Sequence, residues 1–258
     1  MLHDALVPLP AEGRVFRAGR RVRLADADAS GRLRLDGCAR YLQDIGNDDT
    51  AESGIEDPST TWVARRAVID VHRAPRWREW VDLATWCGGT GGRWAERRMS
   101  LVGDKGGRVE IATLWVHVSL ATMAPARVPA AFHEIYGSAA GGRTVSAKRW
   151  LTTAPDDAAG EVPWPLRAVD IDLLGHLNNA AYWAAVEDQL APAGRSADPH
   201  PLLRGPHRAV IEYGAGIEPG SEVVLRVAAG DRLAVWFTVD GVTHATVAVM
   251  PLPPAAAI

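Results

Sequence analysis

An internal repeat restricts the fold of this chain more than any other feature of its sequence. Three segments of the first half recur in the same order in the second half: residues 26–31 as 170–175, 66–70 as 208–212 and, more weakly, 112–116 as 245–249. The second pair reads Arg-Ala-Val-Ile-Asp and Arg-Ala-Val-Ile-Glu, at an offset of 142 residues (208 − 66). One such match can arise by chance, but three in one order indicate a duplicated domain.

Each copy is predicted to form a strand, a helix and then several strands. In the first copy, Leu35, Cys38, Leu42 and Ile45 fall at helical spacing on one face. The expected strands there cover residues 15–24, 62–71, 80–86, 94–102 and 109–119. In the second copy we expect a strand at 167–170, a helix at 179–190 and strands at 208–213, 222–227, 233–239 and 242–250. Residues 123–150 are rich in Pro, Gly and Ala and are predicted to be a linker with one short helix.

The second predicted helix carries alanine on nearly every side, in the run Asn-Ala-Ala-Tyr-Trp-Ala-Ala-Val-Glu. A surface helix has one polar face, whereas a helix wrapped by a curved sheet needs small side chains where the strands approach. This pattern favours the hot-dog arrangement, an antiparallel sheet around a central helix. We therefore predict an α+β chain of two tandem hot-dog domains, at residues 1–135 and 136–258.

Composition excludes several classes of protein. The formal net charge is −3, whereas a general nucleic-acid binder needs a concentrated positive surface. The N-terminal residues have no continuous apolar run typical of a signal peptide, and no stretch is long and apolar enough for a membrane helix. We expect a cytoplasmic protein with no membrane association. The histidines and the two cysteines lack metal-ligand spacing, so we expect no metal and no cofactor.

The densest group of reactive side chains lies directly before the alanine-rich helix and contains Asp172, His176, Asn178 and Asn179. A carboxylate such as Asp172 can act as a base or a nucleophile. Backbone amides at the start of a helix are unpaired and suit a developing oxyanion. Hydrolysis of a thioester needs both of these. The alternative is purely structural, because Asp, Gly and Asn are also ordinary turn and capping residues.

The segment 170–182 resembles the signature of plant and bacterial acyl-ACP thioesterases, in which an Asp-x-Asn-x-His element precedes Val-Asn-Asn and a tyrosine. Further likeness covers nearly the whole chain: residues 62–66, 75–77, 115–116, 127–129 and 211–213. The resemblance implies a thioester hydrolase that releases long- or medium-chain fatty acids from acyl carrier protein. It assigns Asp172 and His176 to catalysis, and Asn178 and Asn179 to oxyanion binding or substrate orientation.

Two positions depart from that family. Its asparagine falls on Leu174 and its later glutamate on Gly216, neither of which can take over the polar role. Glu218 is the candidate second carboxylate. The departures favour a reduced mechanism with one carboxylate, Asp172. In the first copy Asp28 matches Asp172, but Arg32 replaces the histidine, so the resemblance gives that half the acyl pocket and no chemistry.

Arginines crowd one stretch of the first half, and Arg65, Arg66, Arg73 and Arg76 are the candidate docking residues for an acidic carrier. They equally fit solvated strand faces or the phosphates of acyl-CoA. Three functions therefore stay open: hydrolysis of acyl carrier protein thioesters, hydrolysis of acyl-CoA, and acyl binding without turnover. Acyl-chain length is also open, and we expect a monomer or a homodimer because fused hot-dog units satisfy each other's pairing.

Overall fold

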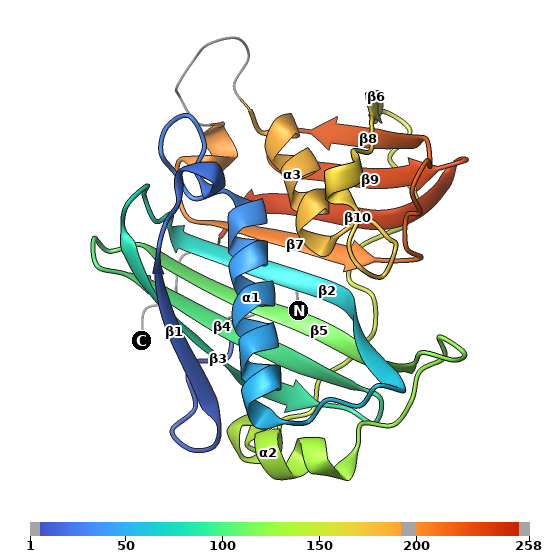
Figure 1. Ribbon diagram of the computed structural model, residues 1–258. Coiled ribbons are helices and arrows are strands. Elements are labelled where there is room, and N and C mark those ends of the chain that lie inside the picture. Colours follow the sequence, from blue (N-terminus) through green and yellow to red (C-terminus); the bar gives the residue numbers. More distant parts are fainter. Residues whose placement is uncertain (1–5, 192–199, 253–258) are drawn as a thin grey trace.

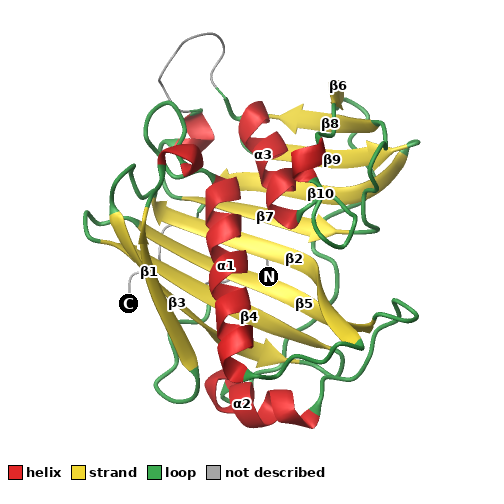
Figure 2. Ribbon diagram, in the orientation of Figure 1, coloured by secondary structure: helices red, strands yellow, loops and turns green. Residues whose placement is uncertain are grey.

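The computed structural model describes residues 6–191 and 200–252. The described strands form one ten-stranded antiparallel sheet in the order β1-β3-β4-β5-β2-β7-β10-β9-β8-β6. Two long helices, α1 (Leu35–Ser53) and α3 (Asn179–Gln189), lie on the same face of this sheet (Figures 1 and 2). The sheet curves around them, so the predicted arrangement of two sheet-wrapped helices is confirmed.

The two halves contribute the same elements in the same order. The first half holds β1 (Val15–Arg21), α1, β2 (Thr60–Arg73), β3 (Trp80–Thr90), β4 (Trp94–Gly103) and β5 (Arg108–Ser119). The second half holds β6 (Gly160–Trp164), α3, β7 (His207–Tyr213), β8 (Val223–Ala229), β9 (Leu233–Val239) and β10 (Val242–Pro251). A third helix, α2 (Ala130–Ala140), lies between them in the chain, and short 3-10 turns occur at Leu24–Asp26, Ala168–Asp170 and Pro201–Leu203.

The repeated pentapeptide joins the two halves, because its two copies pair with each other. β2 and β7 run antiparallel with Val68 opposite Val210, the same 142-residue offset (210 − 68) as the repeat. Antiparallel pairing of a motif with itself places the arginine of each copy opposite the acidic residue of the other. Arg208 accordingly bonds the Asp70 carboxylate at 2.5 and 2.6 Å. The halves are thus related by an approximate two-fold axis through this strand pair.

The helices bury their apolar residues against the sheet and against each other. α3 presents Ala180, Trp183 and Ala185 at no more than 3% exposure, as expected for a helix enclosed by strands. α1 contributes Leu35, Cys38, Leu42 and Ile45 to the same core, which confirms the helical spacing read from the sequence. No helix in residues 6–191 or 200–252 is long and apolar enough to cross a membrane.

One predicted element was wrong. Residues 167–170 form a 3-10 turn, and the opening strand of the second half is β6, seven residues earlier (167 − 160). The Asp170 carboxylate accepts hydrogen bonds from the Arg167 amide at 3.0 Å and from the Arg167 guanidinium at 2.7 and 3.0 Å, which closes the turn. α2 confirms the short helix of the linker. The predicted domain boundary between residues 135 and 136 falls inside α2. The division of the chain at this point stays a prediction.

Candidate functional site

The candidate site lies in the loop between the Ala168–Asp170 turn and α3. The Asp172 amide donates to the His176 carbonyl at 2.9 Å, and the Gly175 amide donates to the Asp172 carbonyl at 3.0 Å. Gly175 has a positive φ of 79°, a backbone conformation that favours glycine. This tight turn holds the side chains of Asp172 and His176 beside the start of α3, and both are half-buried.

The Asp172 carboxylate is only partly engaged. Its Oδ1 accepts a hydrogen bond from the Leu174 amide at 2.9 Å, which fixes the side chain. No hydrogen bond to Oδ2 is found within the described part of the chain. One oxygen of this carboxylate is therefore held in place while the other is available to a water molecule or a substrate.

His176 packs against Gly216, the position at which the related family has a glutamate. A Cβ atom on Gly216 would lie 2.6 Å from Cδ2 of the His176 ring, so the ring occupies the space that a side chain would need. The neighbouring residues tie the loop down, because the Leu177 amide donates to the Ile217 carbonyl at 2.8 Å. The glycine thus permits this position of the histidine.

Asn178 is the N-cap of α3, and its Oδ1 accepts from the Ala180 amide at 2.8 Å. The Asn178 amide itself donates to the Asp170 carbonyl at 2.8 Å. The structural alternative, capping, therefore accounts for the Asn178 side chain. The Asn179 amide, in contrast, has no acceptor among the residues that the structure describes. An unpaired amide at the positive end of a helix can bind an oxyanion.

Sequence reasoning gave Tyr182 no role, although the tyrosine is part of the motif. Its side chain is 3% exposed on the first turns of α3. Burial first, and then the negative charge of Asp172, raise the pKa of Tyr182 well above its usual range. The phenol therefore stays protonated, and a protonated phenol can donate a hydrogen bond.

The matching loop of the first half has the same backbone conformation, but both oxygens of its carboxylate, Asp28, accept hydrogen bonds from the protein. Asp28 Oδ1 accepts from the amide and hydroxyl of Ser30 and from the Arg32 amide, and Oδ2 accepts from the Arg32 guanidinium at 2.9 Å. Burial raises the pKa of Asp28, but these hydrogen bonds outweigh burial and leave the pKa below its usual value. Both oxygens of Asp28 are therefore occupied by the protein itself.

The matching helix start is closed as well. The Leu35 amide, which corresponds to the Asn179 amide, donates to Oε1 of Glu187 at 2.6 Å. Glu187 lies on α3, is buried, and also accepts two bonds from Arg32, at 2.5 and 3.2 Å. A carboxylate of the second half thus occupies the anion position of the first half. Glu187 therefore has a structural role.

Gln43 on α1 corresponds to Glu187 at the offset of 144 (187 − 43), and sequence reasoning missed it. Its Nε2 lies 3.4 Å from Oδ1 of the Asn178 cap. The repeat contained the signal, because it pairs Gln43 with Glu187, but the meaning of the pair depends on how α1 and α3 cross. At the second helix start a neutral amide therefore stands where the first has a carboxylate.

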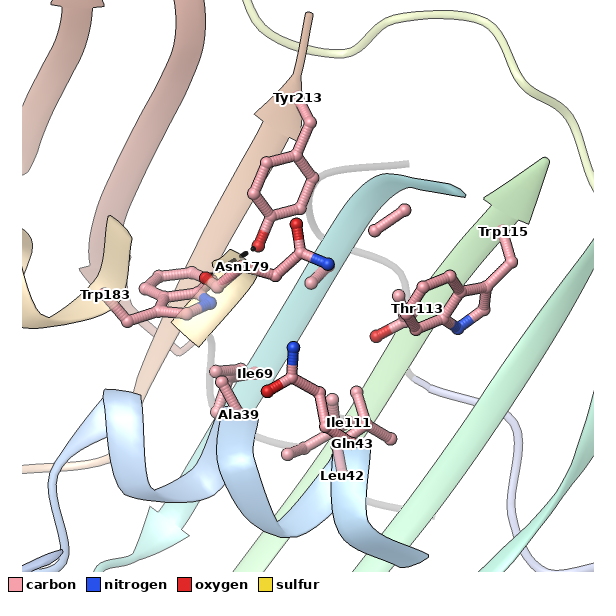
Figure 3. A pocket seen from close by; sticks show the side chains of 12 residues that line it. Ala39, Leu42, Gln43, Ile69, Ile111, Thr113, Trp115, Asn179, Trp183 and Tyr213 are labelled. Atoms are coloured by element: carbon pink, nitrogen blue, oxygen red, sulfur yellow. Dashed lines mark hydrogen bonds between the residues drawn. The ribbon is translucent and has the colours of Figure 1, made fainter. Parts of the chain in front are cut away.

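A pocket joins the helix start to the core between the two halves (Figure 3). It takes residues from α1, β2, β5, α3 and β7, and its free volume of about 20 Å³ accommodates one water-sized group. Most of the lining is apolar, while Gln43, Thr113 and Asn179 are polar. The Tyr213 hydroxyl donates to the Asn179 carbonyl at 3.3 Å and holds the helix start against β7. An acyl chain is larger than this volume, so it can enter the pocket only if the lining side chains move.

The remaining predicted residues are spread over the surface and the strand junction. Leu174 and Glu218 are exposed, and no hydrogen bond or ion pair joins the Glu218 carboxylate to Asp172 or His176 in the described residues. Arg73 and Arg76 are exposed, as a docking role requires. Arg66 is the exception.

The docking prediction is wrong for Arg66, which is 4% exposed. Its guanidinium stacks on Trp150 and donates to the carbonyls of Ser146 and Lys148, each at 3.0 Å. Arg65 donates to the Tyr213 carbonyl at 2.6 Å and is half-buried. Arg65 and Arg66 are consecutive residues of β2, the strand that pairs with the second half. The sequence alone did not reveal this pairing.

Comparisons with known proteins agree with this architecture. Residues 13–136 match the model of the acyl-ACP thioesterase N-terminal domain, and residues 153–232 match that of the C-terminal domain. An uncharacterized protein of Mycobacterium tuberculosis (strain ATCC 25618 / H37Rv) is 34% identical over 222 residues, 86% of each chain.

Two solved structures share the fold. The 12:0-ACP thioesterase from Umbellularia californica gives a TM-score of 0.74 at 18% identity and covers 93% of this chain and 97% of its own. An acyl-ACP thioesterase from Bacteroides thetaiotaomicron gives 0.73 at 17% identity, with 92% and 97% covered. At these identities the likeness concerns the fold of two tandem hot-dog units.

Proposed function

The chain belongs to the acyl-ACP thioesterase family, and from that premise we propose that it hydrolyses long- or medium-chain fatty-acyl thioesters of acyl carrier protein to free fatty acids. The family supports thioester hydrolysis as the reaction. The observation that carries the proposed site is the contrast between the two loops: the carboxylate and the amide that are occupied in the first half are both available in the second.

In the proposed reaction Asp172 is the general base. Oδ2 takes a proton from a water molecule as the water oxygen attacks the thioester carbonyl carbon. The carbonyl oxygen becomes an oxyanion, which the Asn179 amide stabilises. The tetrahedral intermediate then expels the thiolate of the carrier, and the proton held by Asp172 neutralises the thiolate. Direct attack by Asp172 is the alternative that the same free oxygen supports.

His176 and Tyr182 are proposed to support this step. His176, held over Gly216, would orient the substrate or stabilise the developing charge. Tyr182 stays protonated and would donate a hydrogen bond to the substrate or to the attacking water. Glu218 remains a proposed second carboxylate only if the segment after Gly216 moves, because it is exposed in this structure.

The carrier is the second part of the proposal. Arg73 and Arg76 are exposed and can attract an acidic carrier protein, whereas Arg66 is excluded by its internal bonds. Acyl-CoA is the alternative because exposed arginines can also contact nucleotide phosphates. Acyl binding without turnover is favoured only by Leu174 and Gly216, which lack the polar groups of the family.

Thiol release from matched acyl carrier protein and acyl-CoA substrates tests these proposals. We expect turnover that falls at least about 100-fold in Asp172→Asn and is retained in Glu218→Gln. Electrostatic docking predicts that the preference for the carrier protein weakens as ionic strength rises. A wild-type protein that binds acyl chains but releases no thiol from any substrate contradicts the hydrolase assignment.

A further inference from the structure

The pocket between the halves contains a polar group without a partner. Thr113 on β5 is 2% exposed and lines the pocket, and its hydroxyl has no hydrogen-bond partner in the described residues. Two residues along the same strand, Trp115 also lines the pocket, and its indole Nε1 is likewise buried without a partner. Leaving a buried hydroxyl or N–H unpaired is costly. In a protein that buries plain hydrocarbon in this pocket, two such groups on one strand serve no purpose.

The polar residues lie close to where a thioester would react. Figure 3 shows the Thr113 hydroxyl on the side of the pocket that faces Gln43 and Asn179. The Asn179 side-chain amide also has no hydrogen-bond partner within the described segments. Asn179 begins α3, and its backbone amide is the proposed oxyanion donor. Because Asn179 both lines the pocket and supplies the proposed oxyanion donor, the polar part of the pocket adjoins the first carbons of the acyl chain.

A ligand oxygen would satisfy these groups. The Thr113 hydroxyl can donate or accept, and the Asn179 amide does both through separate atoms, while Trp115 can only donate. A hydroxyl or oxo oxygen on the acyl chain meets these requirements, whereas a methylene group meets none. The remaining lining, including Leu42, is apolar, and the rest of the acyl chain can pack against it once these side chains move.

We propose that the pocket selects acyl thioesters that carry a hydroxyl or oxo oxygen at carbon 3, recognised by Thr113. This inference rests on the proposed thioester hydrolysis. The two assignments can fail separately, because binding to the pocket is measurable without turnover.

The test compares three acyl thioesters of one chain length, unsubstituted, 3-hydroxy and 3-oxo, on the same carrier. We expect kcat/KM of the wild type to be about tenfold higher for an oxygenated chain, as one hydrogen bond predicts. Thr113→Val keeps the shape, removes the hydroxyl and is expected to abolish that preference. Thr246→Val is the matched control, because Thr246 is a buried threonine outside the pocket whose hydroxyl donates to the Thr152 carbonyl at 3.2 Å.

Stability gives an independent readout. Thr113→Val is expected to leave Tm unchanged or raise it, since an unpartnered hydroxyl is removed, whereas Thr246→Val lowers Tm. Equal kcat/KM for plain and oxygenated chains in the wild type, or a preference that persists in Thr113→Val, overturns the proposal and leaves a trapped water as the partner of Thr113. If no thioester is hydrolysed, the Kd values of hydrolysis-resistant amide analogues decide the question in the same way.

Discussion

The loops that precede α1 and α3 share one backbone conformation but carry side chains of different chemistry. Five backbone hydrogen bonds of the first loop and the turn before it recur in the second half at an offset of 144, among them Asp28 to Arg32 at 2.8 Å and Asp172 to His176 at 2.9 Å. Gly31 and Gly175 turn both loops with positive φ angles of 81° and 79°. The side chains differ: Arg32 and Glu187 fill the first site from inside the protein, while His176 and Gln43 leave the second open.

The comparison teaches that a duplicated site can be closed by charge without any change of the fold. The buried carboxylate of Glu187 stands at the position that matches the proposed oxyanion site of the second half, and the Arg32 guanidinium pairs with both Glu187 and Asp28. Removing one member of such a cluster leaves a buried charge unpaired, which is costly, and the intact cluster leaves no room for chemistry. The approximate two-fold axis makes the reverse exchange testable, because each residue of one site has a numbered counterpart in the other.

Gln43→Glu should close the second site as Glu187 closes the first. The new carboxylate is expected to accept a hydrogen bond from the Asn179 amide, since the start of α3 attracts negative charge. We expect kcat for thioester hydrolysis to fall about 100-fold, the usual cost of losing one oxyanion donor. Gln43→Ala is the control, because it removes the amide without adding charge. Equal losses of kcat in the two variants would argue against occupation of the Asn179 amide by the new carboxylate.

Glu187→Gln should open the first site at the expense of stability. The change removes the charge that pairs with Arg32 and weakens the bond from the Leu35 amide. We expect the free energy of unfolding to fall by about 2 kcal/mol, the range for hydrogen bonds to charged groups. Urea unfolding at neutral pH measures this loss, and thiol release per folded molecule is expected to stay unchanged. Unaltered stability would mean that the buried cluster contributes nothing.

Gly216→Ala should displace the His176 ring. Because the added Cβ would lie 2.6 Å from the imidazole ring, the ring must shift. We expect kcat to fall about tenfold, the equivalent of about 1.4 kcal/mol in transition-state stabilisation. Ala74→Gly, the change at the matching position of the first half, is the control and should leave kcat unaltered. Histidine NMR signals of both variants would show whether the ring has moved.

Asp28 should confer a modest dependence of stability on pH. Its pKa is lower in the folded protein than in the unfolded chain, so its ionised form stabilises the fold above about pH 4, the unfolded pKa. That contribution is lost as the pH falls through the lower, folded pKa. At neutral pH the wild type should therefore be more stable than Asp28→Asn by about 1 kcal/mol or less. This difference in the free energy of unfolding should shrink in acid. A stability difference that does not change with pH contradicts this assignment.

Much of the fold could be predicted because the repeat and the hydrophobic spacing are local signals. The helix at 179–190 and the strand at 233–239 needed only periodicity, turn residues and the offset between copies. The 3-10 turn at Ala168–Asp170 was mistaken for a strand because its Arg167–Asp170 hydrogen bonds are a side-chain feature that spacing does not reveal.

The site was predictable in part for the same reason. Asp172, His176, Asn178 and Asn179 lie close together in the chain, so a motif brings them together. Gln43 lies more than a hundred residues away, and the burial of Arg66 depends on the pairing of β2 with β7. Contacts of this kind follow from the three-dimensional arrangement of the halves.

The most direct measurement is thiol release by Asp172→Asn and Asp28→Asn, assayed side by side on one acyl carrier protein substrate. The two carboxylates occupy equivalent turns, so a purely structural role predicts similar losses. We expect Asp172→Asn to lose at least about 100-fold in kcat and Asp28→Asn to stay within about threefold of the wild type. Equal losses in both variants, or full activity of Asp172→Asn, would contradict the assignment of the reaction to the open second site.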